Sequence, residues 1–174
     1  MSTLSLTFDN TPNSSAIGYV TLPITGSGLA VSITWGDGTT HDNTSLSHTY
    51  WVTGAYTVVI TVTSGTVTQF GNSSSTWTGN NKLTEVATND TSTWGLRGVS
   101  RFSGAFKGCT ALTVVPTQMP SSVTNMNFMF SHATSFNHDI GNWDVSNVTY
   151  MVSMFYGATA FNQPLADWDV SKVE

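Results

Sequence analysis

The chain has 174 residues, of which 9% are charged, and its formal net charge at pH 7 is -5. That length allows one ordinary domain or two small ones, with a core that holds without disulfide bonds. The chain has only 5 lysines and arginines. It therefore lacks the basic surface that binds nucleic acids or anionic membranes. A single cysteine, Cys109, excludes an internal disulfide framework and a zinc site built from several cysteines.

The sequence has no apolar run that approaches the ~20 residues of a membrane helix. Its first residues alternate polar and apolar side chains, without the basic start and continuous apolar stretch of a secretory signal. We therefore expect no membrane insertion. Either the chain is not exported by the secretory route, or a signal has been removed ahead of residue 1.

The first third of the chain alternates apolar and polar residues with a period of two. The alternation covers residues 4–8, 31–35 and 56–63, and β-branched residues are frequent in it. This pattern is typical of half-buried antiparallel strands, and turn residues such as Gly36-Asp37-Gly38 separate the runs. Several short strands at this spacing predict a β-sandwich.

Three sequence pieces in this region follow one another in a fixed order. They are Ile33-Thr34-Trp35-Gly36-Asp37-Gly38-Thr39, His48-Thr49-Tyr50 and Gly54-Ala55-Tyr56-Thr57-Val58. Because of these three pieces, residues 3–64 resemble a PKD domain, which is an immunoglobulin-like β-sandwich. We expect Asp37-Gly38 to form a tight hairpin turn, because both residue types tolerate positive φ. Trp35 is then a core residue, and Tyr50 anchors the corner before the last strand.

The second half of the chain contains a repeat of 25 residues. Residues 123–147 and 148–172 match at positions that include Met126/Met151, Phe130/Phe155, Phe136/Phe161 and Trp143/Trp168, and residues 99–122 form a divergent earlier copy. A fixed period of this length predicts a solenoid, in which stacked neighbours bury the apolar face that one repeat cannot bury alone. Apolar spacings of three and four predict a helical turn or two in each repeat, followed by a loop and a short strand.

The same repeats resemble a known family. The run from Gly104 to Leu112 and both Met-Phe…Ala-Thr-x-Phe-Asn…Trp-Asp-Val-Ser runs are similar to BspA-type leucine-rich repeats, in the 25-residue form called the mycoplasma-lipoprotein or DUF285 repeat. This likeness covers residues 80–174, and it implies a cell-surface or adhesion module without catalytic activity.

The predicted fold is therefore mainly β with short helices. A PKD-like β-sandwich occupies residues 1–66, and a connector with a divergent first repeat follows over residues 67–98. A short leucine-rich-repeat-like solenoid of about three repeats then spans residues 99–174. Asn137/Asn162 and Asp144/Asp169 are expected to stack as polar ladders on its loops.

Motifs for phosphate binding, a serine nucleophile, a zinc protease and an EF-hand are absent from the sequence. We therefore predict no catalytic residue, no cofactor and no metal site. His41, Asp42 and His48 are a weak metal candidate, because His48 has a better explanation in the His-Thr-Tyr turn. Asp144 and Asp169 could share a calcium ion, but each is followed two residues later by a serine, which favours turn capping. Cys109 takes the place of an alanine of the later repeats, so we expect a buried structural thiol.

Three tryptophans, Trp51, Trp77 and Trp94, follow no clear period. Aromatic faces bind sugars and the side chains of partner proteins, so each is a candidate ligand contact. The alternative is that they cover the junction between the sandwich and the repeats.

Three classes of function remain open. The first is a non-catalytic display or attachment protein, the second a bacterial cell-surface adhesin fragment, and the third a carbohydrate-binding accessory module of an enzyme. The missing export signal favours a virion-surface protein, such as a capsid decoration or tail component. Its partners would be capsid, tail or host-surface proteins, with surface glycans and homo-oligomers left open and nucleic acid excluded. Edge strands and the open end of the repeats are the expected docking surfaces.

Overall fold

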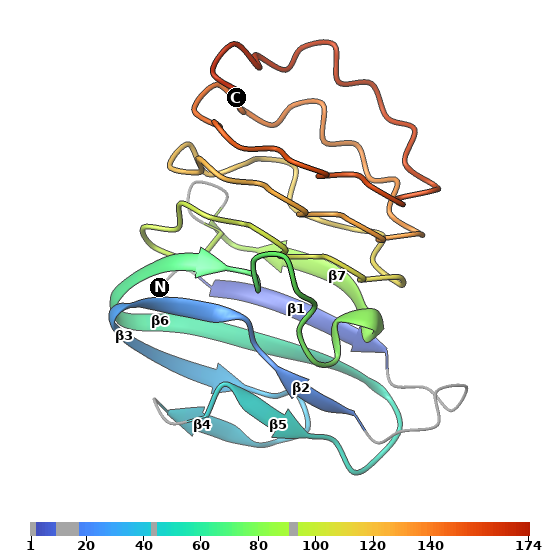
Figure 1. Ribbon diagram of the computed structural model, residues 1–174. Helices are drawn as coiled ribbons and strands as arrows, with labels where there is room; N and C mark the ends of the chain where they lie inside the picture. The colour runs from blue at the N-terminus through green and yellow to red at the C-terminus, as the bar shows by residue number, and fades with distance from the viewer. Residues whose placement is uncertain (1–2, 10–17, 43–44, 91–93) are drawn as a thin grey trace.

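A computed structural model describes residues 3–9, 18–42, 45–90 and 94–174, and Figure 1 shows its two parts. The strands lie in the first half, and the repeats form layers above them that end at the C-terminus. The described elements are β1 (Thr3–Asp9), β2 (Tyr19–Thr21), β3 (Ile24–Thr34), β4 (Thr40–Asp42), β5 (Ser47–Thr49), β6 (Ala55–Phe70), the 3₁₀ helix η1 (Asn80–Lys82) and β7 (Leu83–Thr88).

The strands form two antiparallel sheets. The larger sheet has the order β4-β3-β6-β1-β7, and β2 pairs with β5 in the smaller one. The predicted alternation is confirmed, because Leu4 and Leu6 of β1 are buried opposite Ile60 and Val58 of β6, while the residues between them are more exposed. The prediction of a mainly β chain is also confirmed.

The turn between β3 and β4 closes a hairpin, as the sequence predicts. Thr34 pairs with Thr40, and the Trp35 amide donates a hydrogen bond to the Thr39 carbonyl at 3.0 Å. The left-handed conformations fall on the two glycines that flank Asp37, with φ of 81° at Gly36 and 92° at Gly38. Glycine is favoured at such positions because it has no Cβ.

The larger sheet continues into the repeats. Strand β7 comes from the connector, yet it pairs with β1 at the edge of the sandwich. Parallel bridges then join Glu85 of β7 to Val114, and Gln69 of β6 to Arg101. Val114 and Arg101 lie in residues 99–122, which we call the first repeat from here on; residues 123–147 and 148–172 are the second and third repeats. The sandwich and the repeats therefore share one hydrogen-bonded ladder and one apolar core.

Successive repeats lie one above another with equivalent residues in contact. The parallel ring pairs are Phe130–Phe155 at 5.7 Å, Phe136–Phe161 at 5.7 Å and Trp143–Trp168 at 6.5 Å between centroids, each with an interplanar angle of 6°. The Asn162 amide donates to Asn137 Oδ1 at 2.8 Å, so the expected asparagine ladder is present. The matching positions of the sequence repeat thus lie one layer apart.

The helical turns and short strands predicted inside the repeats are wrong for residues 99–174, which contain turns and isolated bridges only. Peptide groups alternate in direction along each layer. The Phe102 and Gly104 amides bond to the second repeat, whereas the Ala105 and Lys107 amides close turns within the first repeat. Left-handed residues recur four apart, as at Phe128 and His132, and they prevent an α-helix while keeping its apolar spacing. The described residues also contain no helix with the length and apolar character of a membrane span.

Candidate functional site

A hydrogen-bonded cluster holds the β3–β4 turn against the segment that contains β5. Asp37 Oδ1 accepts hydrogen bonds from the Thr39 hydroxyl at 2.7 Å and the Thr39 amide at 3.1 Å, and Asp37 Oδ2 lies 2.7 Å from His48 Nε2. The His48 ring stacks on Trp35 with centroids 4.9 Å apart, and the Tyr50 hydroxyl donates to the Trp35 carbonyl at 2.7 Å. Trp35 is a core residue, and Tyr50 anchors its corner, as expected.

The electrostatics of this cluster stabilise the ionised carboxylate. Burial by itself would raise the pKa of Asp37. The hydrogen bonds from Thr39 and His48, together with the positive charge that His48 can carry, outweigh that effect and lower the pKa from 3.8 to about 2. Burial and the nearby charge of Asp37 raise the pKa of the Tyr50 phenol. The hydrogen bonds of this cluster therefore tie the β3–β4 turn to the segment that contains β5, and they favour the ionised Asp37 carboxylate.

Acidification is expected to weaken the hydrogen bonds that the Asp37 carboxylate accepts in this cluster. Because the folded-state pKa of Asp37 lies below its ordinary value, the ionised carboxylate stabilises the fold above about pH 4 and loses this contribution as the pH falls towards 2. We expect a loss of about 1 kcal/mol, since solvent screens a partly exposed group. Urea unfolding of the protein and of Asp37→Asn measures it: the two should differ at pH 5 and converge near pH 2. An equal difference at both pH values would contradict the assignment.

The described residues contain no group of three or more metal-ligating side chains. The side chains of His41 and Asp42, which the sequence offered as weak metal candidates, lie outside the described part of the chain. Asp144 Oδ1 accepts bonds from the Ser146 amide and hydroxyl, and these bonds lower the pKa of Asp144. The capping interpretation of this aspartate is thus the one that the geometry supports. Asp169 accepts the equivalent amide bond from Ser171.

Two of the three candidate tryptophans lie in the core at the junction. Trp94 is 0% exposed, packs against Phe102 at 4.8 Å and donates its indole N–H to the Gln118 carbonyl. Trp77 is 5% exposed and donates its indole N–H to the Ala105 carbonyl at 2.8 Å. Both rings are buried, so the ligand-contact hypothesis does not fit these two residues. Cys109 is also buried, and burial raises the pKa of its thiol well above the usual value.

Trp51 differs from the other two because 79% of it is exposed. It lies two residues after the end of β5, and its neighbour Val52 is exposed as well. Tyr19 of β2, which pairs with Thr49 of β5, adds a half-exposed ring to the same sheet. Trp51 therefore remains a candidate contact for a sugar or a partner protein.

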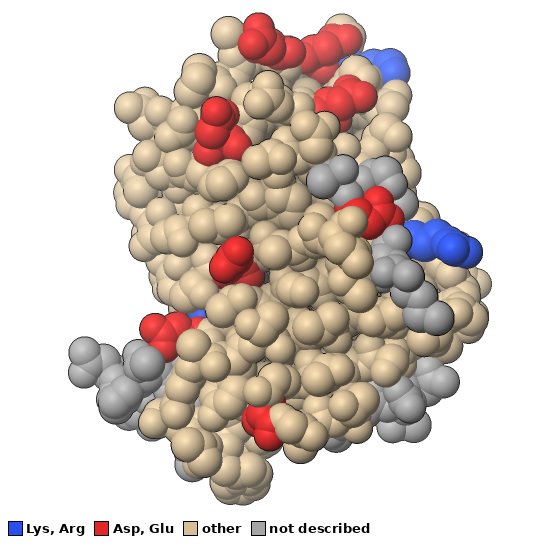
Figure 2. Space-filling model, turned by 180° about the vertical axis from the view of Figure 1, so that it is seen from behind, with Lys and Arg blue, Asp and Glu red and all other residues tan. Residues whose placement is uncertain are grey.

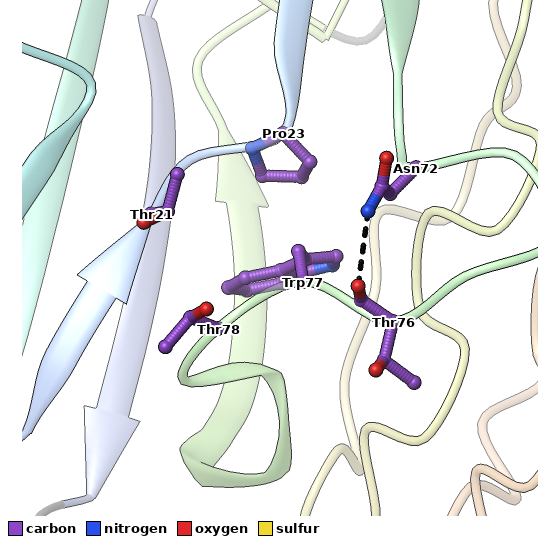
Figure 3. A pocket seen from close by; sticks show the side chains of 6 residues that line it. All are labelled: Thr21, Pro23, Asn72, Thr76, Trp77 and Thr78. Carbon is purple, nitrogen blue, oxygen red and sulfur yellow. Dashed lines mark hydrogen bonds between the residues drawn. The ribbon is translucent and has the colours of Figure 1, made fainter.

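Two of the hollows among the described residues are small. One of about 210 Å³ lies between the β2–β3 link and the loop after β6, and Figure 3 shows Pro23 and Thr21 on one side of Trp77 and Asn72 on the other. The Asn72 side chain there donates to the Thr76 carbonyl at 3.0 Å. A second, of about 270 Å³, runs between β7 and residues 114–117. Ligand sites usually begin at about 300 Å³, so these hollows suit no sizeable organic molecule.

The last layer of the repeats forms a surface that we call the terminal face, made of the third-repeat residues Met151, Phe155, Phe161, Leu165, Trp168 and Val170. Their counterparts in the second repeat are buried by the third repeat, whereas these residues are only partly covered. Val145, for example, is 1% exposed, and its counterpart Val170 is 51% exposed. The residues of the terminal face are thus less buried than their counterparts in the second repeat.

Comparison with known families agrees with this architecture. Residues 15–78 match the PKD domain. Residues 70–174, more than half of the chain, match the family described as Mycoplasma protein of unknown function, DUF285. The chain belongs to the DUF285 family. The two matches together point to a surface or adhesion type of module. No curated protein and no solved structure matches the chain.

Sequence reasoning missed how the sandwich covers the first repeat. The Arg101, Ala105 and Lys107 carbonyls of that repeat accept hydrogen bonds from the Phe70 amide, the Trp77 indole and the Asn80 side chain, in that order. Only the irregular position of Trp77 between the two families' motifs hinted at such a role. The repeats therefore begin on a surface whose donors match their acceptors.

Proposed function

We propose that this DUF285-family protein is a non-catalytic attachment protein, which docks through one end of its body and projects the other. Its location would be the surface of a virus particle, as a capsid decoration or tail component. Its partners would be capsid, tail or host-surface proteins. The alternative location is a bacterial cell surface, where the same body would serve as part of an adhesin.

The observation that carries this proposal is the continuous joint between the two parts. Strand β7 lies in the sandwich sheet and also bridges to Val114, while β6 bridges to Arg101. The aromatic core crosses the joint without a break, from Phe70 to Phe102 and Phe106. A body of this kind holds its two ends at a fixed separation, which suits a spacer that presents a binding surface.

Imaging tests the location. Gold-labelled antibody against the protein is applied to intact virus particles and to intact cells from the same culture. Label on capsids or tails supports the virion proposal, and label on the cell envelope supports the adhesin alternative. Label confined to the cell interior would contradict attachment in either form.

The exposed Trp51 favours carbohydrate as a second class of partner. We expect Trp51→Ala to abolish binding on a glycan array if this ring is the sugar platform, because a stacked aromatic ring provides much of the apolar contact. The free energy of unfolding of the Trp51→Ala variant should differ from that of the unchanged protein by less than about 0.5 kcal/mol, as for other exposed positions. Tyr150→Ala, at an exposed ring on the repeats, is the matched control and should keep binding. An array without hits for the unchanged protein would exclude this partner class.

A further inference from the structure

Strand β7 lies at one edge of the larger sheet, and the first repeat covers only part of its outer side. The Val86 amide donates to the Val114 carbonyl at 2.9 Å, and the Thr113 amide donates to the Thr84 carbonyl at 3.0 Å. Backbone groups that point away from β1 alternate along the strand with groups that bond to it. Because Thr84 and Val86 point away from β1, the Thr88 amide does so as well.

A proline ends this row of hydrogen bonds. The next donor along the first repeat would be residue 116, but Pro116 has no N–H, and its carbonyl accepts from the Trp143 indole at 2.9 Å. None of the described residues 114–117 bonds to the Thr88 amide. The two segments therefore separate beyond Val114. The hollow of about 270 Å³ between β7 and residues 114–117, which we call the β7 hollow, lies where they separate.

The walls of the β7 hollow combine apolar surface with one carboxylate. Val86, Val114 and Pro116 are among its apolar lining residues, and Glu85 and His138 line it as well. Glu85 forms no hydrogen bond or ion pair with another residue in the described part of the chain. Its lining contains no lysine or arginine, so the carboxylate is available to a cation from outside.

Size and charge together select the occupant of the β7 hollow. It is too small for a sizeable organic ligand, but one long side chain needs less room. The aliphatic stem of a lysine or arginine can pack on the apolar walls while its cationic end reaches Glu85, and a neutral His138 ring can accept a second hydrogen bond. The chain carries a net charge of -5, and Figure 2 shows acidic side chains scattered over one face of the molecule. This field attracts a basic partner and repels an acidic one.

We infer that the β7 hollow docks a lysine or arginine side chain, carried on an extended segment of a partner protein. The segment runs along the outer side of β7, and one of its backbone carbonyls accepts from the Thr88 amide, as in strand addition to a sheet edge. This inference rests on the proposed attachment function and names the chemistry of the partner. Peptide binding and location on a particle are measured separately, so either can fail alone.

The probe is the synthetic peptide acetyl-Thr-Thr-Lys-Thr-Thr-amide, added to the full chain at neutral pH. We expect saturable shifts of the Glu85, Ala87 and Thr88 amide signals in NMR spectra. At saturation, hydrogen exchange of the Thr88 amide should slow by about tenfold or more. The same peptide with norleucine in place of lysine keeps the aliphatic stem without the charge, and it should bind about tenfold more weakly. n-Butylamine supplies the cation without a backbone, so it should leave the Thr88 exchange rate unchanged.

Two matched variants locate the partner of the cation. Glu85→Gln keeps the shape of the side chain but removes its charge, so it should weaken binding of the lysine peptide by about tenfold. Asp139→Asn removes the same charge from an exposed residue next to His138 and should change binding by less than about twofold.

The inference is overturned if the norleucine peptide binds as tightly as the lysine peptide, if both variants weaken binding equally, or if exchange of the Thr88 amide stays fast. It is also overturned if rising protein concentration shifts the same amides without peptide, because the occupant would then be a second copy of the chain. The peptide comparison and the exchange measurement use the unchanged protein, so a variant that fails to fold does not remove the test.

Discussion

Trp94→Ala is expected to be among the most destabilising substitutions in this protein. The ring is fully buried and contacts Phe102 and Phe106 of residues 99–122 and Trp143 of residues 123–147. Its indole N–H donates to the Gln118 carbonyl. Removing a buried tryptophan costs about 3–5 kcal/mol through lost contacts and the cavity that remains. In a chain of this length that lowers the melting temperature by roughly 10 °C.

The matched control is Trp51→Ala, because both variants remove the same side chain. Trp51 is exposed, so its loss should leave the urea midpoint nearly unchanged. Trp94→Phe should fall between the two, since it keeps a ring in the core but loses the indole donor. Similar midpoints for Trp94→Ala and Trp51→Ala would contradict the burial of Trp94 against the rings of the repeats.

The contrast between these two tryptophans also shows what the sequence could predict. Periodicity identified the sandwich strands and the matching layers, because burial imposes a regular pattern on side chains. It could not separate Trp51 from Trp94, since neither residue lies in a periodic run. Their difference depends on contacts between distant segments, such as Trp94 with Trp143, which no local pattern records.

The conformation of the repeats was missed for a related reason. Apolar spacings of three and four fit both an α-helix and the turn-based layer that the structure contains. What separates them is a left-handed backbone at two positions in each layer. In the second repeat these are Phe128 and His132, residues that seldom adopt it, so their identity gave no warning. The local signal lay in the glycines at 104, 108 and 157, which take the same left-handed positions in the other layers.

Gly104→Ala is expected to destabilise the first layer strongly. Gly104 has φ of 66°, and a Cβ added there would lie 2.0 Å from the backbone carbonyl oxygen of Ser73. The left-handed conformation costs an L-residue about 1–2 kcal/mol, and overpacking against fixed backbone adds about 1–3 kcal/mol. Urea unfolding should therefore show that the free energy of unfolding falls by about 2–5 kcal/mol. The added Cβ would push the first repeat away from the loop that contains Ser73.

Ser153 offers the control that separates these two costs. It lies at the equivalent position of the third repeat with φ of 52°, so an L-residue already tolerates the conformation there. Ser153→Ala should change stability little, and Ser153→Gly should stabilise by up to about 1 kcal/mol by relieving the left-handed strain. If Gly104→Ala proved as mild as Ser153→Ala, the close approach of the loop to the first repeat would be wrong. The sandwich would then cover that layer less tightly than the bonds of Trp77 and Asn80 require.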